Sequence, residues 1–92
     1  MAAFDRTNQK MVGLSGLRKE VGSNIAIVVG TGQAFTVATK IKKVTSGFGM
    51  TDTDGIPCVA TKGVVSGGQV TFNRLGTIQT SADTITYELH GY

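Results

Sequence analysis

The segment from Asp83 to Tyr92, DTITYELHGY, constrains the fold of this 92-residue chain more than any other segment. Ile85, Tyr87 and Leu89 fall on one side of an extended backbone, while polar side chains fall on the other. Strict alternation of this kind is typical of a β-strand that has one face in a hydrophobic core. The pattern predicts that the fold closes with this strand fixed in a sheet.

The upstream chain repeats short alternating runs that are separated by glycine-rich turns. Val, Ile and Thr are abundant and Leu is scarce, which favours strands over helices. About six to eight short strands at intervals of about ten residues predict an all-β fold, a small antiparallel β-sandwich or barrel. The expected strands are 9–15, 24–29, 33–45, 46–51, 56–62, 69–74 and 83–92, with turns at 30–32, 52–55 and 66–68, while 16–22 is left open between a helical turn and a loop.

The length fits one domain, and the pattern divides it into an N-terminal arm over 1–8 and a single β domain over 9–92. A chain of this size buries only about 60–65% of its unfolded surface, so self-association is a natural supplement to its stability. Phe4 is the only aromatic residue of the arm, and Tyr87 and Tyr92 lie in the last strand, which can pair across subunits. These three residues are the candidate oligomer contacts.

Targeting signals are not visible in the sequence. The start of the chain, MAAFDRTNQK, lacks the apolar stretch of a signal peptide. No apolar run approaches the roughly 20 residues that span a bilayer. The single cysteine, Cys58, cannot form an intramolecular disulfide. We therefore expect synthesis in the cytosol, without export by the usual route and without a membrane partner.

No residue pattern indicates catalysis. Cys58 and His90 can act as a nucleophile pair only if the fold brings them together. Strand parity instead predicts that Cys58 points inward and that His90 points outward. None of the six acidic residues is expected in an apolar setting, and they offer no paired acid and base.

Two loops resemble ligand motifs only in part. Gly30 and Gly32 follow an apolar run, but the third small residue that opens a helix in a dinucleotide site is missing. Asp52 and Asp54 resemble the start of a calcium loop, but the later bidentate Glu of that loop is missing. We interpret both segments as turns, and the sequence predicts no enzyme, cofactor or metal site.

The net charge of +3 permits contact with an anionic surface without requiring it. Lys40, Lys42 and Lys43 form the densest basic cluster. On a strand, Lys40 and Lys42 share the face opposite Phe35, Val37, Thr39 and Ile41, and Lys43 points the other way. We interpret the lysines as protection of an edge strand against unwanted pairing. The alternative hypothesis is a small basic β-barrel that binds nucleic acid, with possible anion contacts at Lys40, Lys42, Lys43, Lys62 and Arg74.

Two segments carry a family resemblance. Thr39 to Thr45, TKIKKVT, and the alternating strand from Ile85 to Gly91 resemble small β-rich virion proteins of tailed bacteriophages. The resemblance implies a structural protein of a virus particle, with a capsid-decoration or tail-associated role. It also implies a major capsid or tail protein as partner, and location in the virion after synthesis in the host cytoplasm. It brings no catalytic residues.

The leading hypothesis is therefore a non-enzymatic viral structural protein that acts through protein–protein contacts as a homo-oligomer. The basic barrel that binds nucleic acid is the second hypothesis, and a small-ligand or sugar-binding module is the third. The third ranks last because the sequence has only four Phe and two Tyr for stacking.

Overall fold

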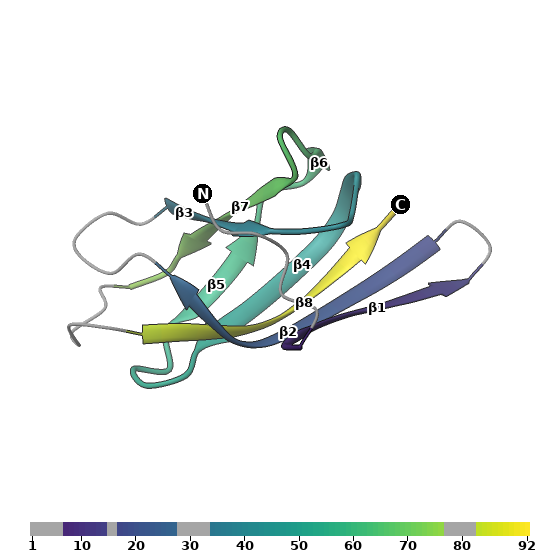
Figure 1. The fold of residues 1–92 in the computed structure, drawn as a ribbon. Helices are drawn as coiled ribbons and strands as arrows, with labels where there is room; N and C mark the ends of the chain where they lie inside the picture. The colour runs from purple at the N-terminus through teal and green to yellow at the C-terminus, as the bar shows by residue number, and fades with distance from the viewer. Residues whose placement is uncertain (1–6, 15–16, 28–33, 77–82) are drawn as a thin grey trace.

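The computed structural model describes residues 7–14, 17–27, 34–76 and 83–92. It confirms the all-β class, because its antiparallel strands form one sheet that curls into a half-barrel (Figure 1). The described residues contain no helix, and hence none that is long and apolar enough to cross a membrane. The strands are β1 (Gln9–Leu14), β2 (Leu17–Ile27), β3 (Ala34–Ala38), β4 (Lys43–Thr51), β5 (Pro57–Ala60), β6 (Gly63–Val64), β7 (Gln69–Arg74) and β8 (Asp83–Gly91).

The strand order explains which parts of the sheet can meet a partner. The sheet runs β1-β2-β8-β4-β5-β7-β3, and the short β6 pairs with the start of β4. β8 is thus hydrogen-bonded on both sides, by β2 and by β4. The expectation that the last strand pairs across subunits is wrong, because its backbone groups are already used within the sheet. The edge strands of the described sheet are β1 and β3.

The hydrophobic core lies inside the curl. The alternation of β8 is confirmed, because Ile85 and Leu89 are fully buried and Tyr87 is only 3% exposed. The Phe72 ring stacks on Phe35 at 5.7 Å and meets the edge of Tyr87 at 5.4 Å between ring centres. The core residues come from six of the eight strands and one connection, and they are Ile25, Phe35, Val37, Ile41, Val44, Cys58, Ala60, Val70, Phe72, Ile85, Tyr87 and Leu89.

The segment 16–22, which we left open between a helical turn and a loop, belongs to a strand from Leu17 onward. β2 continues to Ile27 through an irregularity between Gly22 and Ile25. Asn24 adopts a φ of 56° there, a left-handed conformation that asparagine tolerates. The extra residue changes the side-chain parity, so that even-numbered positions point inward before the bulge and Ile25 points inward after it.

The expected long strand over 33–45 is interrupted, because β3 ends at Ala38 and β4 begins at Lys43. The side-chain faces up to Lys42 are as predicted, because Thr39 and Ile41 are buried, as are the inward residues of β3. Lys43 does not point to the inward face as predicted but is exposed, because a new strand begins there with Val44 buried. The predicted turns at 52–55 and 66–68 are confirmed, and glycines with positive φ occupy both. The turn expected at 30–32 lies outside the described residues.

Candidate functional site

A buried carboxylate lies at the gap that the half-barrel leaves between its two sheet edges. The side chain of Glu20 on β2 is fully buried, so the expectation that no acidic residue lies in the interior is wrong. Its Oε2 accepts a hydrogen bond from the hydroxyl of Tyr87 at 2.5 Å. Its Oε1 accepts from the hydroxyl of Thr39 at 2.8 Å and from the backbone N–H of Lys40 at 2.8 Å. Three donors from two other segments of the chain thus offset the cost of burying this charge.

Gln9 extends this network to the other edge of the sheet. Its Nε2 donates to the Tyr87 hydroxyl at 2.6 Å and to the backbone carbonyl of Ala38, at the end of β3, at 2.6 Å. β1 and β3 are therefore connected by a side chain, although no ladder hydrogen bonds join them. We call these buried polar residues the polar seam, which consists of Gln9, Glu20, Thr39 and Tyr87.

The absence of a side chain at Gly22 leaves room for the ring of Tyr87, so that its hydroxyl reaches Glu20 and Gln9. The two residues are directly opposite in the β2–β8 register. A Cβ at Gly22 would lie 2.3 Å from a ring carbon of Tyr87, so any larger residue there would displace the ring. Burial, reinforced by the hydrogen bond to Glu20, raises the pKa of the Tyr87 hydroxyl. The phenol therefore remains a protonated donor in the interior.

The outer face of β4 and β5 carries apolar side chains where solvent-facing polar residues are usual. Phe48 is directly opposite Val59, and Met50 is directly opposite Pro57. The exposed fractions are 59% for Phe48, 53% for Met50 and 47% for Val59. Polar residues of the neighbouring strands flank them, with Glu88 beside Phe48 and Asn73 beside Val59. We call Phe48, Met50, Pro57 and Val59 the outer apolar cluster.

The predicted lysines are brought together at one end of the sheet, where β8 ends and where β4 begins beside β6 (Figure 1). The backbone carbonyl of Tyr92 accepts hydrogen bonds from the N–H groups of Lys42 at 2.6 Å and Lys43 at 3.3 Å. The start of β2 adds two cations that the sequence interpretation missed, since Arg18 pairs with Gly91 in register. We call the exposed cations of this region the basic end: Arg18, Lys19, Lys40, Lys42, Lys43 and Lys62.

The interpretation of the lysines as edge protection is wrong. Lys43 begins β4, a central strand between β8 and β5, and Lys40 and Lys42 lie in the connection that precedes it. Arg74 does not join them. It lies at the far end of β7, only 2% exposed, with its guanidinium carbon 5.3 Å from the centre of the Phe35 ring. Its position on the same parity as Phe72 was the signal in the sequence for this inward orientation.

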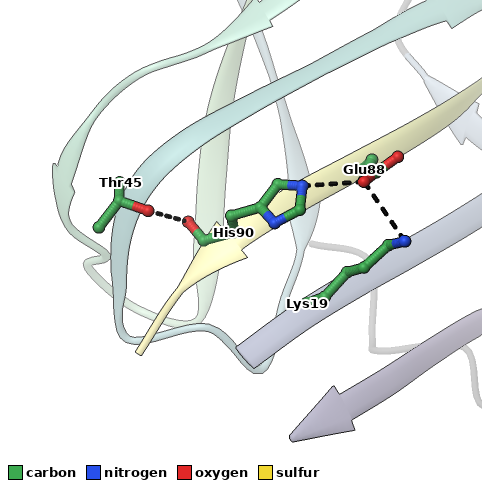
Figure 2. A network of polar contacts seen from close by, with 4 residues as sticks. All are labelled: Lys19, Thr45, Glu88 and His90. Carbon is green, nitrogen blue, oxygen red and sulfur yellow. Dashed lines mark hydrogen bonds and ion pairs between the residues drawn. The ribbon is translucent and has the colours of Figure 1, made fainter. Parts of the chain in front are cut away.

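A small ionic network lies on the outer face beside the basic end (Figure 2). Oε1 of Glu88 is 2.8 Å from Nε2 of His90 and 3.4 Å from Nζ of Lys19. The hydrogen bond from His90, together with the charge of Lys19, lowers the pKa of the Glu88 carboxyl. The hydroxyl of Thr45 donates to the backbone carbonyl of His90 at 3.0 Å. His90 is thus occupied in surface contacts.

Cys58 and His90 are not brought together. Cys58 is buried, and burial raises the pKa of its thiol despite the opposing effect of the Arg74 charge. His90 lies on the outer face with Glu88. The described residues also contain no group of three or more His, Cys, Asp or Glu side chains that is placed to hold a metal ion.

The candidate oligomer contacts differ in how much surface they expose to a partner. Tyr92 is 53% exposed at the basic end, whereas Tyr87 is an interior residue of the polar seam with no surface for a partner. Phe4 lies outside the described residues, as does most of the expected arm. Asn8 is described, and its backbone carbonyl accepts from the N–H of Ser23 at 3.0 Å, which extends the β1–β2 pairing.

No protein-family model, curated protein or solved structure matches this chain. Its function therefore has to be inferred from its own residues. Two exposed regions qualify as interaction surfaces: the outer apolar cluster and the basic end. The described surface also holds a hollow of about 240 Å³ beside Thr61 and Val70 and one of about 300 Å³ beside Lys10 and Val21. These volumes lie below and at the lower limit of the usual range for ligand pockets, which begins near 300 Å³.

Proposed function

We propose that this chain is a non-enzymatic structural protein of a virus particle, in a capsid-decoration or tail-associated role, and that it acts through protein–protein contacts. The outer apolar cluster carries the proposal. Phe48, Met50 and Val59 are large, adjacent and about half-exposed, on strands whose other face already fills the core. The virion setting comes from the resemblance of 39–45 and 85–91 to phage virion proteins.

The cluster has the composition of a protein-binding surface. Its centre is apolar and aromatic, and its neighbours in register are polar: Glu88, Thr86 and Asn73. Protein interfaces have this arrangement, with an apolar centre inside a polar rim. Aromatic residues and methionine are also enriched at such centres. We therefore assign the outer apolar cluster to a capsid or tail protein as its partner.

The test uses particles of the virus that encodes the chain. Purified particles that lack the protein are mixed with it, and co-sedimentation gives the bound fraction. We expect Phe48→Thr/Met50→Thr to weaken attachment at least tenfold, because truncation of central interface residues costs more than about 1 kcal/mol each. Threonine keeps the preference for a strand.

Val64→Thr is the matched control, because Val64 is 83% exposed but lies on β6, outside the cluster. This variant should attach like the wild type. Failure of the wild-type protein to attach would reject the virion role, and full attachment of the double variant would reject the assigned surface.

The basic end favours a second candidate function, the binding of nucleic acid. Six exposed cations gather there beside the exposed ring of Tyr92. Three of the carboxylates, Asp52, Asp54 and Asp83, lie at the opposite end of β8 and β4, so that the charge is asymmetric. Neutralised phosphates give a steep salt dependence, with a slope of about 0.7–0.9 per contact in log–log form.

This second candidate is tested by fluorescence anisotropy of a labelled single-stranded and a labelled double-stranded oligonucleotide over a series of salt concentrations. Binding that weakens steeply with salt and is reduced by Lys42→Gln/Lys43→Gln would support it. The absence of binding to both oligonucleotides at low salt would reject it.

A further inference from the structure

β1 is an edge strand with a defined set of backbone groups on its outer side. It pairs with β2 alone, from Gln9 opposite Gly22 to Leu14 opposite Leu17. The N–H of Ser23 donates to the carbonyl of Asn8, which identifies Asn8–Ser23 as a hydrogen-bonded pair. In an antiparallel ladder such pairs alternate with pairs that are not hydrogen-bonded.

The alternation shows which residues face outward. Lys10, Val12 and Leu14 direct their N–H and C=O groups toward β2, as Asn8 does. Met11 and Gly13 therefore direct theirs away from the sheet. The other edge strand, β3, is different, because the carbonyl of its last residue already accepts from the side chain of Gln9. The outward groups of Met11 have no such contact among the described residues, so the outer edge of β1 is an available pairing edge.

We propose that the outer edge of β1 pairs antiparallel with β1 of a second copy of this chain, about a two-fold axis at Met11. In this register the N–H and C=O groups of each Met11 bond to those of the other Met11. The two half-barrels then share one continuous sheet, as in strand-addition complexes. The inference deepens the proposed function, on which it rests for the premise that the chain acts by association.

Side-chain chemistry favours a second copy in this register. Lys10 and Val12 are both exposed and share the outer face of β1. With the axis at Met11, Lys10 of each copy is opposite Val12 of the other, so that the lysine stem can cover an apolar neighbour. With the axis at Lys10, the two lysines would be directly opposite, which is destabilising. A two-fold axis also makes the contact self-complementary and closed, which limits it to a dimer.

Thiol pairing tests the register. Lys10→Cys and Val12→Cys are made as separate variants, and the native Cys58 stays silent because it is buried. Opposite residues of a pair that is not hydrogen-bonded have Cα atoms about 4.5 Å apart, within the range of a disulfide. We expect rapid disulfide formation in an equimolar mixture of the two variants and at least tenfold slower formation with either variant alone. Equal rates in all three samples, or no disulfide in any, would overturn the proposal.

A second experiment compares Met11→Pro with Met11→Ala by sedimentation velocity over a concentration series. Both variants lose the side chain, but only proline removes the outward N–H, which the β1–β2 ladder does not use. The dimer dissociation constant should rise at least tenfold more for Met11→Pro than for Met11→Ala, because two hydrogen bonds are lost per dimer. Equal constants, or a wild-type protein that stays monomeric throughout, would overturn the proposal.

These experiments leave the outer apolar cluster unchanged. A protein that attaches to particles but does not dimerise through β1 would reject this inference and retain the proposed function. A protein that dimerises through β1 but does not attach to particles would retain the dimer and reject the virion role.

Discussion

The polar seam and the outer apolar cluster are opposite in chemistry to their surroundings. Inside the curl, where apolar residues dominate, Glu20 and Gln9 are buried. On the outer face of β4, where polar residues are expected, Phe48 and Met50 are more than half exposed. The two regions are therefore opposite exceptions to the rule that apolar side chains lie inside a protein and polar side chains lie outside.

The contacts of each region explain the difference. Every oxygen of the Glu20 carboxylate has a donor: Tyr87 donates from the neighbouring strand β8, and Thr39 and Lys40 donate from the connection after β3, which the sheet does not pair with β2. Its charge is therefore part of how the half-barrel closes. Phe48 and Met50 lie on the outer face, away from the buried core, so the fold gives no reason for their size. An exposed apolar group of this kind indicates a surface that a partner covers.

The largest expected effect comes from removal of the carboxylate of the polar seam. Glu20→Ala leaves the Tyr87 hydroxyl, the Thr39 hydroxyl and the Lys40 N–H without this acceptor in a buried site. Unsatisfied buried groups cost about 1–3 kcal/mol each. We expect the free energy of unfolding, measured in urea, to fall by about 3 kcal/mol or more.

Tyr87→Phe is the matched control, because it retains the carboxylate and removes only the hydroxyl, with its hydrogen bonds to Glu20 and from Gln9. It should cost about 2 kcal/mol, the net value of two typical hydrogen bonds. If Glu20→Ala cost no more than Tyr87→Phe, the polar seam would not be what closes the half-barrel, and the comparison with the outer face would lose its basis.

A second buried carboxylate sharpens the comparison, because its donors are backbone N–H groups, two of them from the turn after β4. Asp83 accepts from the backbone N–H groups of Thr53 at 3.0 Å, Asp54 at 3.3 Å and Thr84 at 2.8 Å. Desolvation works to raise the pKa of Asp83, but these donors outweigh it, so that the pKa lies below the ordinary value of 3.8. Asp83→Asn keeps only one of the two acceptor oxygens and should cost about 1 kcal/mol at neutral pH.

The lowered pKa also fixes the sign of the pH dependence. The folded state favours the ionised form, so the stabilisation by Asp83 is fully present above the ordinary pKa of 3.8 and is lost as the pH falls through the lower folded-state value. Urea midpoints measured for wild type and Asp83→Asn should therefore converge in strong acid. A difference that stays constant with pH would show that the carboxylate charge has no part in holding the turn.

The sequence predicts the fold where one strand face follows a simple alternation, as in β8, and where glycine and aspartate mark a turn, as at 52–55. It could not predict the polar seam, because the bulge after Gly22 breaks the parity of β2 and because Tyr87 meets Glu20 only after β8 inserts beside β2. Only part of the basic end could be predicted, because Lys40, Lys42 and Lys43 lie close together in the sequence. Arg18 and Lys19 join them only through the strand order.

The smallest expected effect on stability is at the outer apolar cluster, and it completes the comparison. Phe48→Thr and Met50→Thr should each change the free energy of unfolding of the monomer by less than about 0.5 kcal/mol, as is usual for surface sites. Truncation of Phe72, which is fully buried, should cost about 3–5 kcal/mol in the same urea titration. A loss above about 2 kcal/mol at Phe48 would mean that its ring supports the sheet. Near-zero values at both positions would leave contact with a partner as the reason for two large apolar side chains in solvent.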